Sequence, residues 1–347
     1  MNLIKKNIYP ILLAILSAVL FGIATPINKL LLNDMNPFSL AGFLYLGASI
    51  GLFPIVLSRK ELLYVFKLNR SNVNRLFGAV ILGGIMGPIL ILFGLKFASA
   101  ASVSLWLNLE LVATSVLGFL FFKDYLGRKG WIGVFIALAS GVLLTINEGN
   151  SGILSAILVA LACICWGFDN HFTSLIDGIS AVQSTFIKGF FAGIINISIG
   201  FFILNSPLSF KFIIYGIILG SISYGISIVL YIISAQKLGA IRSQIIFSSA
   251  PFFGVFFAVI FLSETITILQ IISFILLIFS ITLLAFEKHE HLHEHDKIEH
   301  THLHNHDDFH HDHKHEEKTP FHEHLHLHKS TAHSHPHWPD IHHRHKH

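Results

Sequence analysis

Histidines crowd the C-terminal end of the chain, at a spacing suited to metal ions. All but one of the 24 histidines, His171, lie from His289 onward, interleaved with Asp, Glu and Lys in "HEHLHEHDKIEHTHLHNHDDFHHDHKH". Neutral imidazole binds zinc, nickel, copper and cobalt well, and interleaved carboxylates add oxygen donors without fixing a geometry. We therefore predict a metal buffer of low selectivity, although a proton buffer or an interaction tail would have the same composition. The candidate metal ligands are His289, His291, His293, His295, His310, His311, His313, His322, His324, His326, His342, His343 and His345.

This histidine-rich segment is internally duplicated. "HEHLHEH" at residue 289 recurs as "HEHLHLH" at 322, and "HHDHKH" at 310 recurs as "HHRHKH" at 342. The repetition argues against an added purification tag of uniform histidines. Alternating His-x-His with few apolar residues cannot bury a core, so we expect a disordered tail in the absence of metal.

A second candidate for chemistry is a carboxyl group inside an apolar stretch. Glu110 lies about halfway along "ASAASVSLWLNLELVATSVLGF", and an ionisable group at the bilayer centre costs on the order of 3 kcal/mol, which marks it as a functional hypothesis. It could take and release a proton or meet a cationic group; the alternative is a structural carboxyl bonded to a nearby Ser, Asn or Lys. If Glu110 faces a cavity, the spacing of a continuous helix places Val103, Trp106 and Thr114 beside it. Trp106 would then either bind an organic cation or pack against other helices.

Two further polar groups interrupt apolar stretches of the second half. Lys188, in "STFIKGFFAGI", either extends to the membrane surface or pairs inward with Asp169, Asp177 or Glu110. Asp169 and His171, in "WGFDNHFTS", either form a gate or metal-binding pair or cap a helix end at the interface.

Ser248 and Pro251 predict a bend in another apolar stretch. Proline removes a backbone donor and leaves a carbonyl free, which in a buried helix favours a kink and a local polar site. The candidate functional residues of the apolar stretches are Glu110, Trp106, Thr114, Lys188, Ser248 and Pro251.

Motifs of catalysis and of nucleotide hydrolysis are missing from the sequence. It has no phosphate-binding glycine loop, no zinc-protease helix pair and no nucleophile with a base at a recognised spacing. We therefore expect a protein that is no enzyme, requires no cofactor and draws energy from a gradient. The expected partners are a small-molecule substrate, membrane lipid and Zn, Ni, Co or Cu ions, with no nucleic acid; a homodimer is left open.

The composition is that of a membrane protein. The chain is 53% hydrophobic and 12% charged, whereas soluble domains are about 25% charged. Crossing a bilayer requires about 20 apolar residues per helix, and lipid leaves only helices able to satisfy the backbone of such stretches. The expected fold is all-α. The ten predicted spans are 8–31, 38–57, 75–95, 98–121, 129–147, 152–170, 181–204, 212–234, 241–262 and 266–286.

The loops between these spans differ in positive charge. With the N-terminus in the cytoplasm, twelve Lys and Arg residues lie inside and three outside, which fits the positive-inside rule. An even number of spans returns the C-terminus to the same side. We therefore predict a cell (inner) membrane protein with both termini, and the histidine tail, in the cytoplasm.

An internal repeat divides the apolar part into two halves. The segment "LKFASAASVSLWLNLELVATSVLGFLFFKDYLGRKGWIGVFIALASGVLLT" aligns without gaps with "AQKLGAIRSQIIFSSAPFFGVFFAVIFLSETITILQIISFILLIFSITLLA" at an offset of 140. Five spans per half make the second half inverted in the membrane, an arrangement of the kind used for alternating access. The predicted units are 1–147, 148–286 and the tail 287–347.

These features resemble the EamA-type branch of the drug/metabolite transporter superfamily over nearly all of residues 8–286. The motifs concerned are the join from Lys29 to Pro37, the block "SSAPFFGVFFAVIFLSETIT" and its partner ending "FFKDYLGRKGWIG". The resemblance implies ten helices, a central cavity lined largely by the third, fourth, eighth and ninth of them, and export or exchange of small solutes. The halves nevertheless differ, because Leu111 aligns with Pro251 and Phe43 with Lys188.

The leading hypothesis is a secondary active exporter of a small organic metabolite, coupled to protons through Glu110. The alternatives are a transition-metal exporter for nickel, cobalt or zinc and a membrane-anchored metal buffer or sensor. The apolar stretches weaken the metal-exporter alternative, because they lack a histidine at membrane depth and an obvious facing pair of carboxylates.

Overall fold

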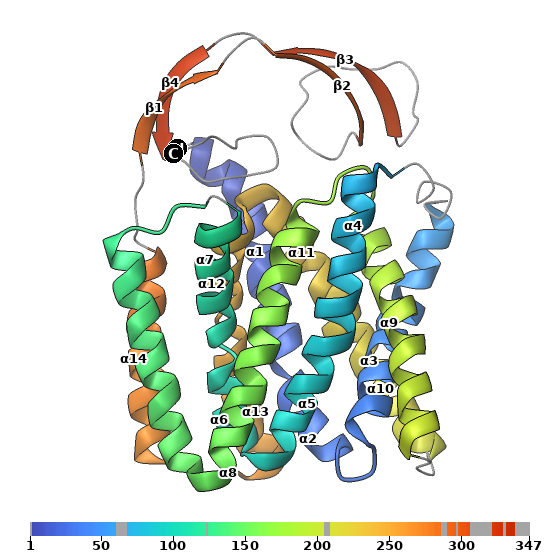
Figure 1. The fold of residues 1–347 in the computed structure, drawn as a ribbon, viewed down its shortest axis with the longest axis vertical. Coiled ribbons are helices and arrows are strands. Elements are labelled where there is room, and N and C mark those ends of the chain that lie inside the picture. The colour runs from blue at the N-terminus through green and yellow to red at the C-terminus, as the bar shows by residue number, and fades with distance from the viewer. Residues whose placement is uncertain are drawn as a thin grey trace.

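The structure is a computed structural model of a helical bundle with short strands at one end (Figure 1). The residues that it describes are 2–59, 68–122, 124–204, 209–285, 290–295, 298–305, 321–328 and 331–336.

Helices account for nearly all of the described chain before residue 286. They are α1 (Asn2–Gly22), α2 (Ala24–Leu31), α3 (Pro37–Ser58), α4 (Arg70–Gly78), α5 (Gly87–Phe97), α6 (Ala100–Trp106), α7 (Leu109–Phe121), α8 (Arg128–Ser174), α9 (Ala181–Leu204), α10 (Phe210–Leu219), α11 (Ser227–Leu238), α12 (Ala240–Phe247), α13 (Ala250–Leu262) and α14 (Ile268–Ala285). Two π-helical segments, η2 (Ala79–Met86) and η3 (Gly220–Ile226), continue α4 into α5 and α10 into α11.

Within the described residues, nine helical segments are long and apolar enough to cross a membrane. One of them, α8, has 47 residues and would be about 70 Å long if straight, more than twice the hydrocarbon thickness of a bilayer. Its backbone breaks at Gly149, with φ 68° and ψ −152°. Figure 1 shows two antiparallel arms of α8 that meet at the lower end of the bundle. The arms correspond to the predicted spans 129–147 and 152–170, so the all-α fold with ten crossings is confirmed.

The repeat seen in the sequence also appears in irregularities of the backbone. The π-helical segments η2 and η3 occupy aligned positions in the two halves. The helix is likewise interrupted at aligned positions, Asn108 between α6 and α7 and Ser248 between α12 and α13. Both interruptions contain bonds across three residues, such as Glu110 N to Leu107 O at 3.0 Å and Ser249 N to Ile246 O at 3.2 Å. Local departures from α-helix of this kind are frequent at functional sites.

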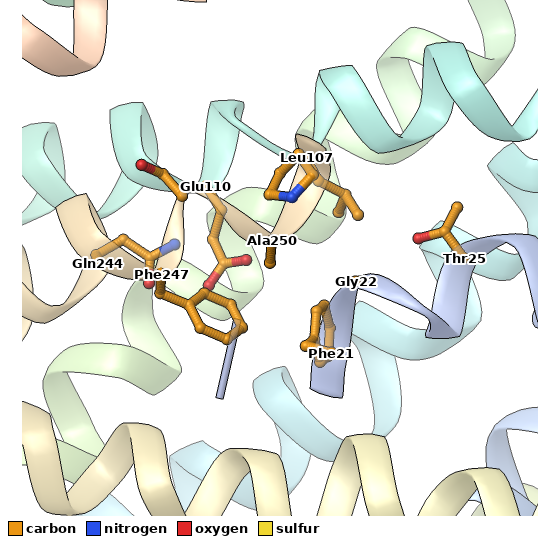
Figure 2. Close-up of a pocket in the computed structure, with 10 residues that line it drawn as sticks. Phe21, Gly22, Thr25, Leu107, Glu110, Gln244, Phe247 and Ala250 are labelled. Carbon is orange, nitrogen blue, oxygen red and sulfur yellow. The ribbon is translucent and has the colours of Figure 1, made fainter. Parts of the chain in front are cut away.

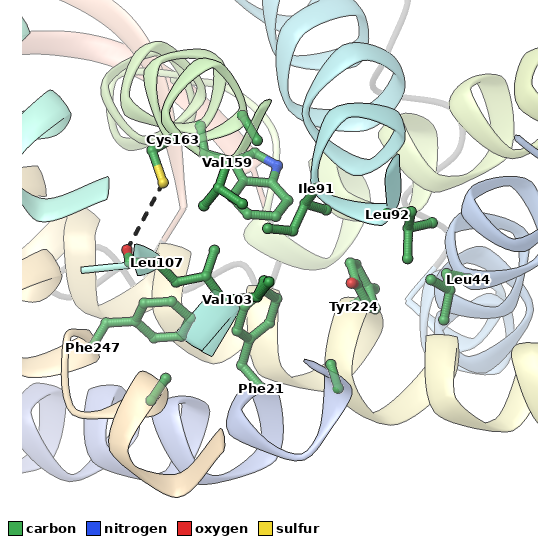
Figure 3. Packing of buried hydrophobic residues seen from close by; sticks show 14 of the residues in the cluster. Phe21, Leu44, Ile91, Leu92, Val103, Leu107, Val159, Cys163, Tyr224 and Phe247 are labelled. Atoms are coloured by element: carbon green, nitrogen blue, oxygen red, sulfur yellow. Dashed lines mark hydrogen bonds between the residues drawn. The ribbon is translucent and has the colours of Figure 1, made fainter. Parts of the chain in front are cut away.

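Side chains divide between a lipid-facing surface and a mixed interior. Large apolar side chains such as Phe202, Phe210 and Ile268 remain more than 70% exposed, which suits contact with hydrocarbon. The interior packs Phe21 between Phe247 and Tyr224, with Val103 and Leu107 alongside (Figure 3). Polar groups cluster between the helices, where hydrogen bonds satisfy them.

The first residues of α1 and the last residues of α14 lie at the same end of the bundle (Figure 1). Beyond this end, the described parts of the tail form two antiparallel strand pairs. The strands are β1 (Glu290–His295), β2 (Ile298–Asn305), β3 (Phe321–His328) and β4 (Thr331–Pro336), paired β1 with β4 and β2 with β3. The His-x-His alternation of these segments fits the two-residue period of a strand.

Candidate functional site

Glu110 lies at the start of α7, just after the interruption that separates α6 from α7. Its side chain is buried, with 6% of the residue exposed. The amide Nδ2 of Asn170, on the second arm of α8, donates to Glu110 Oε1 at 2.8 Å. The same nitrogen lies 3.1 Å from Thr114 Oγ1 and 3.2 Å from Gln244 Oε1. A carboxyl group from the first half is thus held by amides of the second half.

Two cavities meet at this carboxyl group. The central cavity is lined by Phe21, Tyr45, Glu110, Trp166, Asp169, Asn170, Thr173, Lys188, Tyr224, Ile228, Tyr231, Ile232 and Phe247. The side cavity is lined by Phe21, Gly22, Thr25, Leu107, Glu110, Gln244, Phe247, Ser248, Ala250 and Pro251. Figure 2 shows Glu110 beside Phe247 and Ala250, with Phe21 and Gly22 across the side cavity. Glu110 is the ionisable residue that both linings share.

Lys188 turns inward and forms an ion pair in the central cavity. Its Nζ lies 2.7 Å from Asp169 Oδ2, and 2% of the lysine side chain is exposed. Asp169 is one helical residue away from Asn170, so α8 supplies both the partner of Lys188 and the partner of Glu110. Of the alternatives for Lys188, the structure therefore selects pairing with Asp169 over extension to the membrane surface.

The wall around this ion pair is fixed by one carbonyl group of the π-helical segment η2. Gly83 O accepts from Tyr45 Oη at 2.5 Å and from Trp166 Nε1 at 3.1 Å. One backbone carbonyl of the π-helical segment thus orients two aromatic rings of the cavity.

The other predicted transport residues fall in three different places. Ser248 and Pro251 line the side cavity, and Thr114 contacts the cavity residue Asn170. Trp106 lines neither cavity; its Nε1 donates to Gly141 O at 3.0 Å, against the first arm of α8. The tight turn at Leu107 to Asn108 changes the helical phase between Trp106 and Glu110, so spacing along a continuous helix does not hold there.

The helices around the two cavities differ in part from those implied by the resemblance. Residues of the fourth, eighth and ninth crossings line them, as expected, together with residues of the first, second, sixth and seventh. The third crossing contributes no lining side chain to these two cavities. Tyr45 and Trp166 cover the third crossing at Gly83, which explains why this crossing does not line the cavities as the resemblance implied.

His171 and the tail stand apart from this centre. His171 is buried, stacks on Phe122 at 4.3 Å between ring centroids, and lies 2.9 Å from Thr114 O through Nε2 and 3.7 Å from Asp124 through Nδ1. Among the side chains that the structure describes, no group of three His, Cys, Asp or Glu residues could hold a metal ion.

The predicted metal ligands of the tail are only partly within the described residues. His291, His293 and His295 belong to β1, and His322, His324 and His326 belong to β3. The remaining candidates lie outside the described residues: His289, His310, His311, His313, His342, His343 and His345.

Carboxylates join the two halves at the end of the bundle opposite to the first residues of α1 and the last residues of α14. Glu264, between α13 and α14, accepts from the backbone N–H groups of Ala100 and Ala101 at 2.8 Å each, at the start of α6. Glu148, beside the break in α8, accepts from Ser99 Oγ at 2.5 Å. Lys29 Nζ donates to Leu95 O at 2.6 Å and to Ala98 O at 2.9 Å. The helix dipole and free N–H groups at the start of α6 favour such negative charge.

Several residues of the site were not singled out from the sequence. Asn170 and Gln244 bind Glu110 and each other, and Tyr224 and Tyr231 line the central cavity. The two tyrosines are seven residues apart, a spacing that places side chains on one helical face and could have identified them.

Comparisons with known proteins agree with this architecture. Residues 8–146 and 153–286 both match the EamA-like transporter family. An uncharacterized transporter of Methanothermobacter thermautotrophicus is similar to the chain, with 27% identity over 293 residues that cover 78% of this chain and 84% of the relative. A solved crystal structure superposes with a TM-score of 0.60 at 15% identity, covering 80% of this chain and 98% of that one, which indicates a shared fold. The chain is a membrane transporter of the EamA-like transporter family.

Proposed function

We propose that the chain is a secondary active exporter that moves a small organic solute across the cell membrane in exchange for protons taken up by Glu110. The observation that carries the proposal is the position of Glu110, buried at membrane depth and shared by the central and side cavities. Its hydrogen-bond partners among the described residues are the neutral amides of Asn170 and Gln244, and Lys188 is paired with Asp169 instead. A carboxyl group in this setting can change its protonation state when a solute arrives or leaves.

The backbone around Glu110 supports alternating access. The interruptions at Asn108 and Ser248 lie beside the cavities, and the two halves that contain them are aligned by the internal repeat. Rocking of one inverted repeat against the other would expose the Glu110 region to each side in turn. The interrupted helices could bend without breaking a continuous run of helical hydrogen bonds.

The proposed orientation places both termini in the cytoplasm. Support comes from the excess of Lys and Arg in the loops on that side and from the shared end of α1 and α14 (Figure 1). Of the loop residues used in this argument, Lys60, Lys67 and Lys123 lie outside the described residues.

The test begins with cells that do or do not produce the protein. An untargeted comparison of their media should reveal a metabolite that accumulates outside only when the protein is present. That metabolite is then added to proteoliposomes loaded with a pH-sensitive dye. We expect it to drive proton flux through the unaltered protein and not through Glu110→Gln.

Asp34→Asn is the matched control, because Asp34 is exposed and lines neither cavity. It should leave solute-driven proton flux unchanged. Unchanged coupling in Glu110→Gln would remove Glu110 from the mechanism, and the absence of any exported metabolite would count against the exporter itself.

A second candidate function concerns the tail, which we propose binds divalent transition metals. The supporting observation is the register of β2 and β3, which sets His300 opposite His326 and His302 opposite His324. Neutral imidazole is a good ligand for zinc, nickel, cobalt or copper. A chain lacking residues 289–347 should bind fewer nickel, zinc and cobalt ions in calorimetric titrations.

Metal tolerance separates the two proposals. If the tail supplies ions for export or storage, its deletion should lower the tolerance of cells to at least one of these metals. If tolerance to nickel, zinc and cobalt is unchanged while metabolite export persists, the tail has no role in metal export.

A further inference from the structure

Aromatic rings dominate the wall of the central cavity. Six of the residues that line it are aromatic, and they come from six different elements: Phe21, Tyr45, Trp166, Tyr224, Tyr231 and Phe247. Phe21 lies 5.3 Å from Phe247 and 5.5 Å from Tyr224 between ring centroids, in tilted arrangements. Tilted rings present both edges and faces to the enclosed space, and the faces carry partial negative charge.

The lining of the central cavity contains open hydrogen-bond acceptors. Among the described residues, Asp169 Oδ1 and the Tyr231 hydroxyl are buried and have no hydrogen-bond partner. Asn170 Nδ2 has three acceptors within 3.2 Å, on Glu110, Thr114 and Gln244. An amide nitrogen carries only two hydrogens, so Asn170 Nδ2 cannot donate to all three at once.

Four of the side chains that line the cavity donate to acceptors of the protein. Lys188 donates to Asp169, and Tyr45 and Trp166 both donate to Gly83 O. Thr173 Oγ1 donates to Asp169 O at 2.7 Å. Buried polar groups are normally satisfied, so the open acceptors indicate a ligand that brings N–H or O–H donors of its own.

The ionisable side chains give the cavity a net negative charge when Glu110 is ionised. Lys188 and Asp169 cancel each other within their ion pair. Glu110 then remains without an opposite charge among the described residues that line the cavity. A buried charge requires a partner, which is either a proton on Glu110 or a positively charged ligand. A carboxylate ligand would instead lie among two carboxyl groups.

We propose that the central cavity binds a protonated amine, a solute with one positive charge, at least one N–H group and an apolar or aromatic body. Its ammonium group donates to Asp169 Oδ1, the Tyr231 hydroxyl and the Glu110 carboxylate, while its body contacts the rings. This inference rests on the proposed function and names the class of its substrate. One ammonium replaces one proton on Glu110, so the exchange is electrically neutral.

The test compares compounds of similar size that differ in charge. Binding of 2-phenylethylamine, 2-phenylethanol, 3-phenylpropionate and phenylalanine to the purified full chain in detergent is measured by calorimetry. We expect the amine to bind about tenfold or more tightly than the alcohol, because a charge-assisted hydrogen bond replaces a neutral one. The carboxylate should bind most weakly, and phenylalanine more weakly than the amine. Tighter binding of the carboxylate or of phenylalanine, or no binding of the amine, would overturn the proposal.

A second comparison tests the N–H donors. Phenethyltrimethylammonium keeps the positive charge but has no N–H, so it should bind the unaltered protein more weakly than the primary amine. Tyr231→Phe removes one unpartnered acceptor and should reduce the difference in affinity between the primary amine and phenethyltrimethylammonium. Tyr215→Phe, at a tyrosine that is 46% exposed, should leave that difference in affinity unchanged. Equal binding of the two cations to the unaltered protein would contradict donation from the ligand.

The outcomes also separate this inference from the proposed function. If 2-phenylethylamine binds but no metabolite drives proton flux through the unaltered protein, the substrate class stands and the exporter mechanism fails. If an exported anion drives flux that depends on Glu110, the exporter stands and the protonated amine is excluded as its substrate class.

Discussion

Lys188 Nζ lies 2.7 Å from Asp169 Oδ2 in an ion pair that joins α9 to the second arm of α8 inside the membrane part of the bundle. Both side chains are almost completely removed from solvent, so each charge depends on the other for compensation. Because this pair has no net charge, the protonation state of Glu110 determines the net charge of the central cavity.

The ion pair gives a first prediction about stability. Lys188→Met should lower the free energy of unfolding by about 3–5 kcal/mol, because it leaves Asp169 buried and unpaired. The double variant Lys188→Met with Asp169→Asn removes both charges and should regain most of that loss. Denaturant titration in detergent measures both values. Equal losses in the single and double variants would show that burial of an unpaired carboxylate is not the cause.

A second prediction concerns the bond between the two halves at the far end. Glu264→Gln should destabilise the protein by about 1–2 kcal/mol, because the uncharged side chain keeps one acceptor oxygen for the two N–H groups at the start of α6. Asp34→Asn makes the same change of chemistry at an exposed site and should be neutral. Thermal unfolding in detergent compares them, and identical midpoints would argue against a stabilising role for Glu264.

The break in α8 supplies a third prediction. Gly149 has φ 68° and ψ −152°, a conformation that residues with a Cβ atom rarely adopt, and no other atom lies within 4 Å of where a Cβ would be. Gly149→Ala should therefore cost about 1–3 kcal/mol through backbone strain alone. Asn150→Ala, at the neighbouring exposed residue, should change the unfolding midpoint little. If Gly149→Ala leaves the free energy of unfolding unchanged, the two arms of α8 are joined by a different backbone conformation.

A fourth prediction tests the close contact between α1 and α13 beside the side cavity. A Cβ at Gly22 would lie 2.6 Å from Phe253 Cβ and 2.7 Å from Ala250 O, so Gly22→Ala should cost about 1–3 kcal/mol by overpacking. Gly141→Ala is the control, because its nearest contact would be Leu109 Cδ2 at 3.7 Å. Alanine favours helix over glycine, so this control should be neutral or slightly stabilising. Equal stability of the two variants would contradict the tight packing at Gly22.

Much of the architecture is determined by the sequence alone. Long apolar stretches must be helical in lipid, so the ten crossings can be predicted from composition and length. The ungapped internal repeat identifies the two halves, and the burial of Glu110 follows from its place in an apolar stretch. The aligned positions Asn108 and Ser248 mark where both halves interrupt their helices, although proline follows only in the second half.

The arrangement of the polar groups was decided only by the tertiary structure. Lys188 had three candidate carboxylate partners, and packing of α9 against the second arm of α8 selected Asp169. Trp106 and Glu110 were expected beside the same cavity, yet the tight turn between them directs Trp106 to Gly141 and leaves Glu110 at the cavities. Hydropathy is a property of each segment and can be summed along the chain, whereas a hydrogen bond or an ion pair depends on how two distant segments are rotated and packed.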